Sequence, residues 1–205
     1  IMGQPWWKIW GFNPDDCPNT SYTIGYDASD DMVNEKIEEA SWTKVIKVKL
    51  GMTEKEDKRM INLIRAKTDT VICIDANQGW GVEEAIETLN AFAPLDIQHC
   101  DEHIARWNYL SLPSVKKESP IPIMADESCG DEHDAARVID IKACDYFNIK
   151  LCKSGGIYKA LKIVKLAEAA NIHLQVGAMI ESRLAMTAFA HFALCSPMIE
   201  HYDFD

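Results

Sequence analysis

Short apolar runs rich in β-branched and aromatic residues alternate along the chain with segments in which apolar residues recur every three or four positions. The first pattern is typical of buried strands and the second of amphipathic helices. Strands are predicted at Tyr22–Tyr26, Val45–Leu50, Val71–Asp75, Ile97–Asp101, Ile121–Asp126, Phe147–Leu151, His173–Ala178 and Ile199–Asp203. Helices are predicted at Glu54–Ala66, Glu83–Phe92, Glu132–Ile139, Ile157–Ala170 and Ser182–Leu194, and residues 105–117 favour no single element. A capping box at Thr53 and Glu56 opens the first of these helices.

The predicted strands recur at a nearly constant interval. Steps of 24 to 27 residues separate their carboxyl ends, measured through Thr23, Lys49, Asp75, Asp101, Asp126, Lys150, Val176 and Asp203. Eight strand–helix units of similar length predict an α/β fold, the (β/α)8 barrel of parallel strands. A doubly wound open sheet is the main rival, but no G-x-G-x-x-G motif follows the early strands. A leucine-rich solenoid would need an L-x-x-L-x-L pattern that the chain lacks.

Composition and charge narrow the class of protein. The net charge of −11 among 205 residues argues against non-specific nucleic-acid binding. No apolar stretch approaches the roughly 20 residues of a membrane span. Seven cysteines, mostly inside predicted elements, indicate free thiols and hence a cytoplasmic location. The aromatic run Pro5–Phe12 lies before the repeat and needs a covering surface, either under the barrel or on a domain absent from this chain.

Three consecutive predicted strands end in a carboxylate, namely Asp75, Asp101 and Asp126. The active site of a barrel lies at the carboxyl ends of its strands, so these side chains are expected to converge. A single Asp at a strand–helix junction is more often a helix cap. Three in register would repel one another without a cation, and hard oxygen ligands favour one Mg²⁺ ion.

Lysines flank this acidic group. Lys47 and Lys49 are two residues apart in a strand, so both are expected to point into the barrel. Lys150 ends the sixth strand, opposite the second in a ring of eight, and Lys153 is expected in the loop before Gly155. Two lysines on opposite sides of a metal-bound carboxylate suggest a 1,1-proton transfer through an enediolate. Burial and the positive charge of Lys47, Lys49, Lys150 and the ion are expected to lower the pKa of the lysine that acts as base.

A family resemblance rests on five stretches that share these residues. The chain resembles the muconate-lactonising-enzyme subgroup of the enolase superfamily, and within it the dipeptide epimerases of the L-Ala-D/L-Glu type, at Val45–Gly51, Val71–Trp80, Ile123–Ser128, Phe147–Gly156 and Val176–Ala185. The resemblance implies that Lys49 and Lys150 are the opposing acid/base residues. It also implies that Asp75, Asp101 and Asp126 hold Mg²⁺, with Lys47 beside the substrate.

The chain ends in Asp203-Phe204-Asp205, which is similar to the D-x-D motif on the eighth strand of dipeptide epimerases. The resemblance implies that Asp203 and Asp205 bind the α-ammonium group of a dipeptide whose C-terminal residue is epimerised. An N-acylamino-acid racemase or an o-succinylbenzoate synthase of the same subgroup is an alternative, although neither substrate has a free ammonium. A catalytically inactive barrel fragment is the other alternative.

Three departures from the family pattern affect these expectations. The family usually has Glu at the end of the fourth strand, where this chain has Asp101, and strand alternation points the next residue, Glu102, away from the site. Family members carry an N-terminal capping domain, so we expect residues 1–20 to lead in from such a domain. Residues 21–205 are then the barrel domain, truncated after its eighth strand. A homo-oligomer is compatible with the resemblance.

Overall fold

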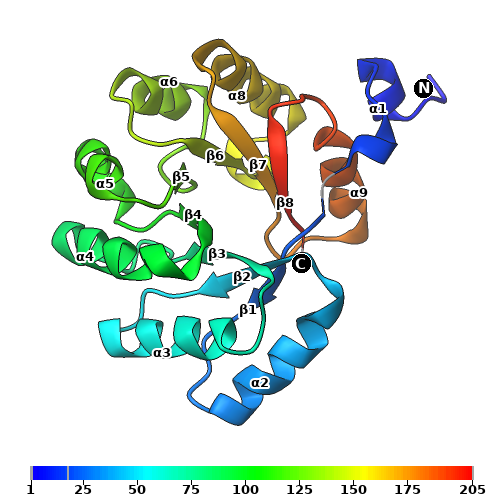
Figure 1. Cartoon of the computed structure of the whole chain (residues 1–205). Helices are drawn as coiled ribbons and strands as arrows, with labels where there is room; N and C mark the ends of the chain where they lie inside the picture. The colour runs from blue at the N-terminus through cyan, green and yellow to red at the C-terminus, as the bar shows by residue number, and fades with distance from the viewer. Residues whose placement is uncertain (1, 18, 205) are drawn as a thin grey trace.

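The computed structural model describes residues 2–17 and 19–204, and within them eight parallel strands form one sheet whose order follows the chain. The strands are β1 (Tyr22–Ile24), β2 (Val45–Lys49), β3 (Val71–Asp75), β4 (Ile97–Asp101), β5 (Ile123–Ala125), β6 (Tyr146–Ile149), β7 (His173–Gly177) and β8 (Ile199–Asp203). Figure 1 shows them as a ring with the helices outside it. The predicted (β/α)8 barrel is confirmed, and β3, β4 and β8 have the predicted bounds.

The ring closes between its last strand and its first. Thr20 forms a parallel bridge with Tyr202, and the Ser21 amide donates a hydrogen bond of 3.0 Å to the Tyr202 carbonyl. The Phe204 amide donates to the Thr20 hydroxyl at 2.9 Å. The two residues just before β1 therefore close the barrel against the end of β8.

Helices follow the strands and cover their outer faces. They are α2 (Asp30–Glu39), α3 (Glu54–Arg65), α4 (Val82–Phe92), α5 (Leu112–Glu118), α6 (Glu132–Asp140), α7 (Leu151–Ser154), α8 (Ile157–Ala170) and α9 (Arg183–Phe192). Short 3₁₀ turns lie at η1 (Pro14–Asp16), η2 (Ala40–Trp42), η3 (Ala93–Leu95) and η4 (Arg106–Ser111). The Thr53 hydroxyl accepts the Glu56 amide, as its predicted capping role requires. Within the described residues, every helix is too short or too polar to cross a membrane.

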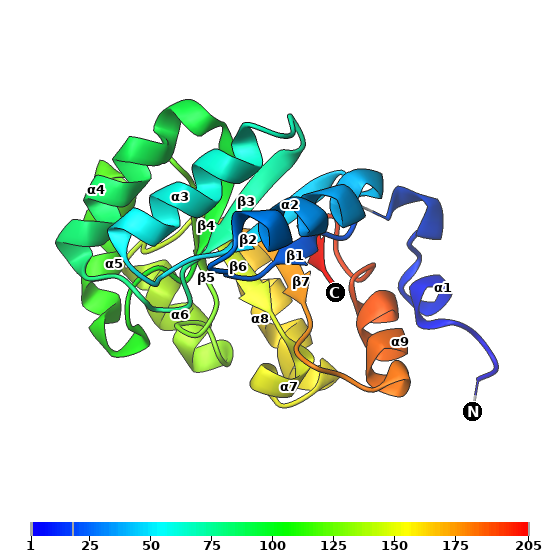
Figure 2. The ribbon, with the colours of Figure 1, turned by 90° about the horizontal axis from the view of Figure 1, so that it is seen from below.

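The aromatic N-terminal run forms a short helix, α1 (Trp6–Trp10), outside the ring. It lies beside α9, as Figure 2 shows, and the Trp6 ring is 5.9 Å from the His191 ring. Trp10 packs against the edge of the core. The N-terminal aromatic residues thus contact the outer side of the barrel near its closure.

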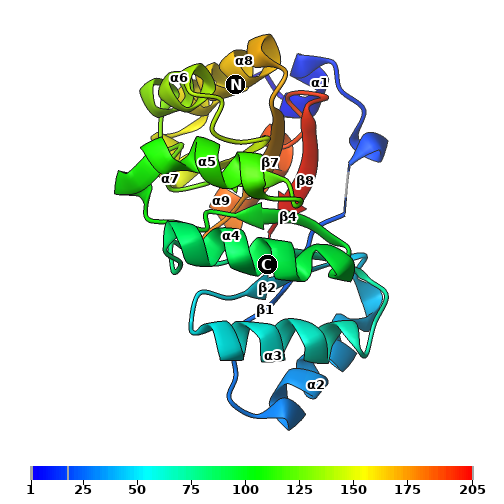
Figure 3. The same ribbon diagram turned by 60° about the vertical axis from the view of Figure 1, so that its left-hand side comes forward.

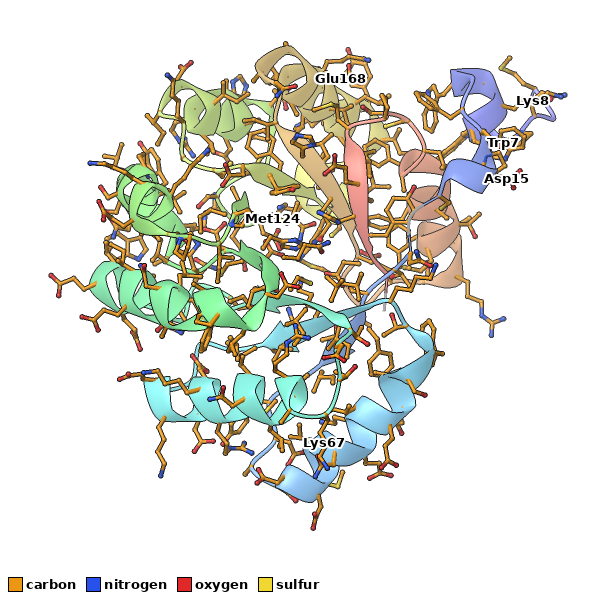
Figure 4. The ribbon with its side chains drawn as sticks, viewed as in Figure 1. Trp7, Lys8, Asp15, Lys67, Met124 and Glu168 are labelled. Atoms are coloured by element: carbon orange, nitrogen blue, oxygen red, sulfur yellow. The ribbon has the colours of Figure 1, made fainter. Side chains whose placement is uncertain are left out.

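Alternation along the strands separates an apolar outer layer from a polar interior. On β2, Ile46 and Val48 are buried on the helix-facing side, whereas Lys47 is 2% exposed inside the ring. His99 and Gln175 are also buried, on β4 and β7. Figure 3 shows α3 and α4 on the outside, in front of β2 and β4. Figure 4 places Met124 among the strands, whereas Lys8 and Lys67 lie at the periphery. An apolar outer layer therefore stabilises the barrel, and polar side chains fill its interior.

Candidate active site

The three predicted carboxylates lie at adjacent strand ends. Asp75 and Asp101 are paired in register at the ends of β3 and β4, and Asp126 directly follows β5. All three side chains are almost completely buried. Their neighbours Ile74, Cys100 and Ala125 belong to the apolar core. Strand alternation therefore turns the three acidic groups into the ring, as the sequence predicts.

Two lysines from β2 contact this acidic group. The Lys47 Nζ atom lies 3.0 Å from Asp75 Oδ2, 3.2 Å from Asp101 Oδ2 and 2.7 Å from Asp203 Oδ2. The Lys49 Nζ atom is 2.7 Å from Asp75 Oδ2 and donates to Asn77 Oδ1 at 3.1 Å. Lys49 is one-third exposed, in contrast to the buried Lys47. The outer lysine is thus the one that a substrate can reach.

Two further lysines contact the acidic group from β6 and α7. The Lys150 Nζ atom lies 2.6 Å from Asp126 Oδ2. The Lys153 Nζ atom lies 2.5 Å from Asp126 Oδ1 and also donates to the backbone carbonyls of Asp126 and Asn148. Lys153 was expected in a loop, which is wrong, because it belongs to α7 and that turn directs its side chain back over β5. Since β2 and β6 are four strands apart in the ring, Lys49 and Lys150 approach from opposite sides.

Burial and charge set the protonation of these groups in opposite directions. Burial alone would raise the pKa of Asp75, but Lys47 and Lys49 lower it to about 2. Burial raises the pKa of Asp101 to about 8, and Asp126 and Asp75 add to this effect against Lys47. The pKa of Asp126 is lowered, since Lys153 and Lys150 outweigh its burial. Asp101 is therefore the carboxylate whose charge is least compensated.

The side chains by themselves do not lower the pKa of Lys150 or Lys47. Burial lowers the pKa of Lys150, but Asp126 and Asp101 outweigh it and the net pKa is raised. The pKa of Lys47 is raised further above its ordinary value, because Asp75, Asp101 and Asp203 together outweigh its burial. Nearby carboxylates together therefore have a larger electrostatic effect on these two lysines than burial and the neighbouring lysines do. The sequence-based expectation did not include the effect of the carboxylates.

Of the two aspartates in the C-terminal D-x-D motif, the structure describes Asp203. Asp203 is 7% exposed and both of its oxygens are bound, Oδ2 by Lys47 and Oδ1 by the Ser21 hydroxyl at 3.0 Å. Asp205 lies outside the described residues. Asp203 is therefore a fixed part of the buried network, and its negative charge is partly neutralised by Lys47.

Glu102 has the outward orientation that alternation predicts. Its Oε2 atom accepts the Asp126 amide at 2.8 Å and the Ser128 amide at 3.1 Å, and its Oε1 atom accepts the Ser128 hydroxyl at 2.6 Å. Burial raises the pKa of Glu102 to about 7. This side chain holds the loop after β5, and so fixes the backbone that carries Asp126.

The three strand-end carboxylates fit Mg²⁺ by donor chemistry and charge. Asp101 Oδ1 is buried without a hydrogen-bond partner in the described part of the chain, and the neighbouring carboxylates disfavour its ionised form. A divalent cation would relieve both conditions. Across residues 2–17 and 19–204, no three His, Cys, Asp or Glu side chains are gathered closely enough to hold an ion as they stand. Lysine ammonium groups balance the carboxylates instead.

Sequence reasoning gave no role to Asn148 or Ser21 and placed Lys153 in a loop, but all three side chains contact carboxylates of the site. Asn148 donates through Nδ2 to Asp101 Oδ2 at 2.8 Å and to Asp126 Oδ2 at 3.3 Å. Ser21 bonds Asp203, and Lys153 bonds Asp126. Asn148 precedes Lys150 by two residues and so shares its inward face, which is a signal that the alternation of β6 contains. Ser21 reaches the site because the barrel closes next to β1, and Lys153 reaches it because it lies on α7.

A large cavity lies away from this chemistry. It has a volume of about 640 Å³ and is lined by residues at the amino ends of β6 and β7, including Tyr146 and His173. Lys116, at its wall, is already paired with Asp145 at 2.9 Å. The charged cluster at the opposite, carboxyl ends of the strands is therefore the stronger candidate for an active site.

Comparisons with known proteins show which family this chain is similar to. The sequence model described as "Enolase C-terminal domain-like" matches residues 31–205. The D-Ala-D/L-Ala epimerase of Cytophaga hutchinsonii is 46% identical over 99% of this chain and 56% of its own length. The chain spans about half the length of the curated relatives it matches.

Solved structures of related proteins superpose closely on this chain. The dipeptide epimerase from Cytophaga hutchinsonii, complexed with Mg and the dipeptide D-Ala-L-Val, superposes with a TM-score of 0.93 at 45% identity, covering 98% of this chain and 55% of that one. The N-succinyl Arg/Lys racemase from Bacillus cereus superposes with a TM-score of 0.87 at 28% identity, covering 91% and 52%.

Proposed function

The chain belongs to the enolase C-terminal domain-like family, and from this membership we propose that it is the barrel of a metal-dependent dipeptide epimerase. The relatives named above include epimerases of dipeptides, one of them solved with Mg and a dipeptide. The observation that carries the proposal is the position of Lys49 and Lys150. Each ammonium contacts a different buried carboxylate, from opposite sides of the barrel.

In the proposed reaction, one proton is removed from the α-carbon and another is added to the same carbon on its opposite face. A neutral lysine removes the α-proton of the C-terminal residue, and the electrons of the broken C–H bond move into the carboxylate as an enediolate. The opposing lysine, in its ammonium form, delivers a proton to the other face of the carbon. Exchange with solvent then resets both lysines, and the configuration of the residue is inverted.

Asp75, Asp101 and Asp126 would hold Mg²⁺, which when bound supplies positive charge beside the substrate carboxylate. Lys47 fixes two of these carboxylates and Asp203 through one ammonium group. Its ammonium is buried and bound to three carboxylates at once, so it serves as a permanent cation beside the substrate. Lys49 and Lys150 remain to exchange protons.

Asp203 would bind the substrate ammonium. Its Oδ1 atom accepts a hydrogen bond from the Ser21 hydroxyl, and a carboxylate oxygen has a second lone pair to offer. Asp205 would provide the second carboxylate of the motif. A dipeptide bound in this way places its C-terminal α-carbon between the lysines.

A racemase of N-acylated amino acids is the second candidate, and one observation favours it. Lys47 already pairs with Asp203 at 2.7 Å, which weakens the attraction of Asp203 for a substrate ammonium. The similarity to the Bacillus cereus racemase is consistent with this alternative. The two candidates share the lysines and differ at the amino group of the substrate.

Deuterium uptake tests the proposal and separates the candidates. The protein is incubated in D₂O with Mg²⁺ and either an L,L-dipeptide mixture or N-acylated amino acids, and masses are followed with time. We expect a one-dalton gain at the C-terminal α-carbon of dipeptides, abolished by EDTA. Exchange confined to the N-acylated compounds would favour the second candidate, and no exchange in either set would contradict both.

A further inference from the structure

Asn148 links two of the strand-end carboxylates through one neutral amide group. Its side chain is fully buried on β6. The Nδ2 atom donates one hydrogen bond of 2.8 Å to Asp101 Oδ2 on β4 and another of 3.3 Å to Asp126 Oδ2, directly after β5. The two hydrogens of the amide thus bind the carboxylates of two different strands. Figure 1 shows β4, β5 and β6 as neighbours in the ring, so this contact spans all three.

The orientation of this amide is determined by the carboxylates. Asn148 Oδ1 is buried and finds no hydrogen-bond partner within the described residues. The reverse orientation would place an oxygen against two carboxylate oxygens, which repel it. The amide therefore gives up a bond at its acceptor in order to donate to both carboxylates.

Gly177 on β7 provides the room for this arrangement. A Cβ atom at Gly177 would lie 2.6 Å from Asn148 Oδ1 and 3.2 Å from Lys150 Cε. Its φ is outside the left-handed region, so the backbone itself does not require glycine. The absence of a side chain at this position is explained by the space that Asn148 and Lys150 occupy.

We propose that Asn148 is a positioning residue that holds Asp101 and Asp126 at the spacing needed for a divalent cation, and that Gly177 is required to seat it. The inference rests on the proposed function, because it concerns the carboxylates assigned to Mg²⁺. An ammonium group at these carboxylates adds positive charge beside the ion. The neutral amide can remain bound while the ion is present.

Mn²⁺ binding without a substrate tests the inference. Electron paramagnetic resonance measures the concentration of free Mn²⁺ and hence its affinity for the protein. Asn148→Leu removes the donor and keeps a similar volume. We expect its Mn²⁺ affinity to fall at least tenfold, as is usual when a partner of a ligating carboxylate is lost. Gln175→Leu is the matched control, since Gln175 is the buried carboxamide paired with Asn148 in register on β7.

Gly177→Ala gives a second measurement should Asn148→Leu fold poorly. Its Mn²⁺ affinity should fall, whereas Gly25→Ala should leave the affinity unchanged, because a Cβ there meets nothing within 4 Å. In an Asn148→Ala background, which empties the space, Gly177→Ala should weaken binding no further. Thermal melting of each variant without metal checks that the barrel is folded.

The outcomes separate the inference from the proposed function. If the unsubstituted protein does not bind Mn²⁺, the metal site and the proposed function are wrong. If it binds Mn²⁺ and Asn148→Leu binds it as well as Gln175→Leu does, the positioning role is wrong. Additive losses for Gly177→Ala and Asn148→Ala would overturn the role given to Gly177.

Discussion

Lys49 and Lys150 have unequal exposure, with 33% of the first side chain and 9% of the second open to solvent. If each serves one face of the α-carbon, Lys49→Ala and Lys150→Ala should each lower epimerisation at least 100-fold, in the range of general acid–base effects. Each variant should still exchange the α-proton of the epimer that faces its remaining lysine. Chiral chromatography of dipeptides after incubation in D₂O measures both quantities.

Lys67→Ala is the control for these two variants, since Lys67 lies at the periphery of the molecule (Figure 4) and should retain full activity. Substantial epimerisation by Lys49→Ala or Lys150→Ala would rule out the two-lysine scheme.

At the scale of single residues, strand alternation predicted the inward side chains well. The inward orientation of Lys47 and Lys49 follows from β2 alone and that of Asp75 from β3 alone, because side chains alternate between the two faces of a strand. Asn148 and Ser21 were not identified, because their role arises from hydrogen bonds to other strands. The raised pKa of Lys150 was missed for the same reason, since it depends on Asp126 and Asp101.

At the scale of elements, buried Asp57 on α3 ties two strand-end loops together. Its carboxylate accepts the Gly51 amide at 3.1 Å, the Met52 amide at 3.2 Å and the Trp80 indole N–H at 2.7 Å. Asp57→Ala leaves these donors without their acceptor and should lower the free energy of unfolding by about 2–4 kcal/mol. Urea denaturation measures the change, with Asp69→Ala at an exposed position expected to have little effect. An equal loss in both variants would contradict this role.

The elements themselves were predicted where the apolar pattern is dense. The helix Ile157–Ala170 was predicted with its observed bounds, and four of its side chains are buried. Helix α2 was missed, since only Val33 and Ile37 are buried among its largely charged residues. Residues 105–117 gave no single pattern because a 3₁₀ turn kinked at Asn108 runs there into α5.

At the scale of the whole molecule, the barrel interior makes stability depend on pH. The centre of the His201 ring lies 4.9 Å from that of His99 and 5.3 Å from that of Tyr146, with the rings tilted to one another. Burial lowers the pKa of His201, Glu200 opposes this shift, and His173 adds to it. The unfolded chain therefore takes up a proton at this histidine below about pH 6.5, whereas the folded chain takes it up only at a lower pH. The free energy of unfolding falls as the pH falls below about 6.5.

Replacing His201 should remove part of this dependence. His201→Phe keeps an aromatic ring beside Tyr146 and cannot be protonated. Its melting temperature should fall less than that of the unsubstituted protein between about pH 6.5 and pH 5, both without metal. His133→Phe alters an exposed histidine and should leave the pH dependence as it was. A parallel decline in all three proteins would exclude His201 as the cause.

The metal site should couple to the stability of the entire barrel, because its proposed ligands lie on or directly after three consecutive strands. A ligand present at 100 times its Kd stabilises a protein by about 2.7 kcal/mol, which is roughly 5–10 °C in melting temperature for a domain of this size. We therefore expect Mg²⁺ to raise the melting temperature and EDTA to reverse the rise.

Asp101→Asn separates metal binding from general stabilisation by ions. The pKa of Asp101 is raised to about 8, so its neutral form is favoured in the folded barrel and a neutral Asn should be tolerated without metal. This variant should melt cooperatively, at or above the temperature of the metal-free unsubstituted protein, and gain little from Mg²⁺. A rise equal to that of the unsubstituted protein would show that Mg²⁺ acts elsewhere. If the unsubstituted chain melted cooperatively but did not respond to Mg²⁺, the inactive-barrel alternative would be favoured. The carboxylates would then be neutralised by the lysines that contact them, Lys47, Lys49, Lys150 and Lys153.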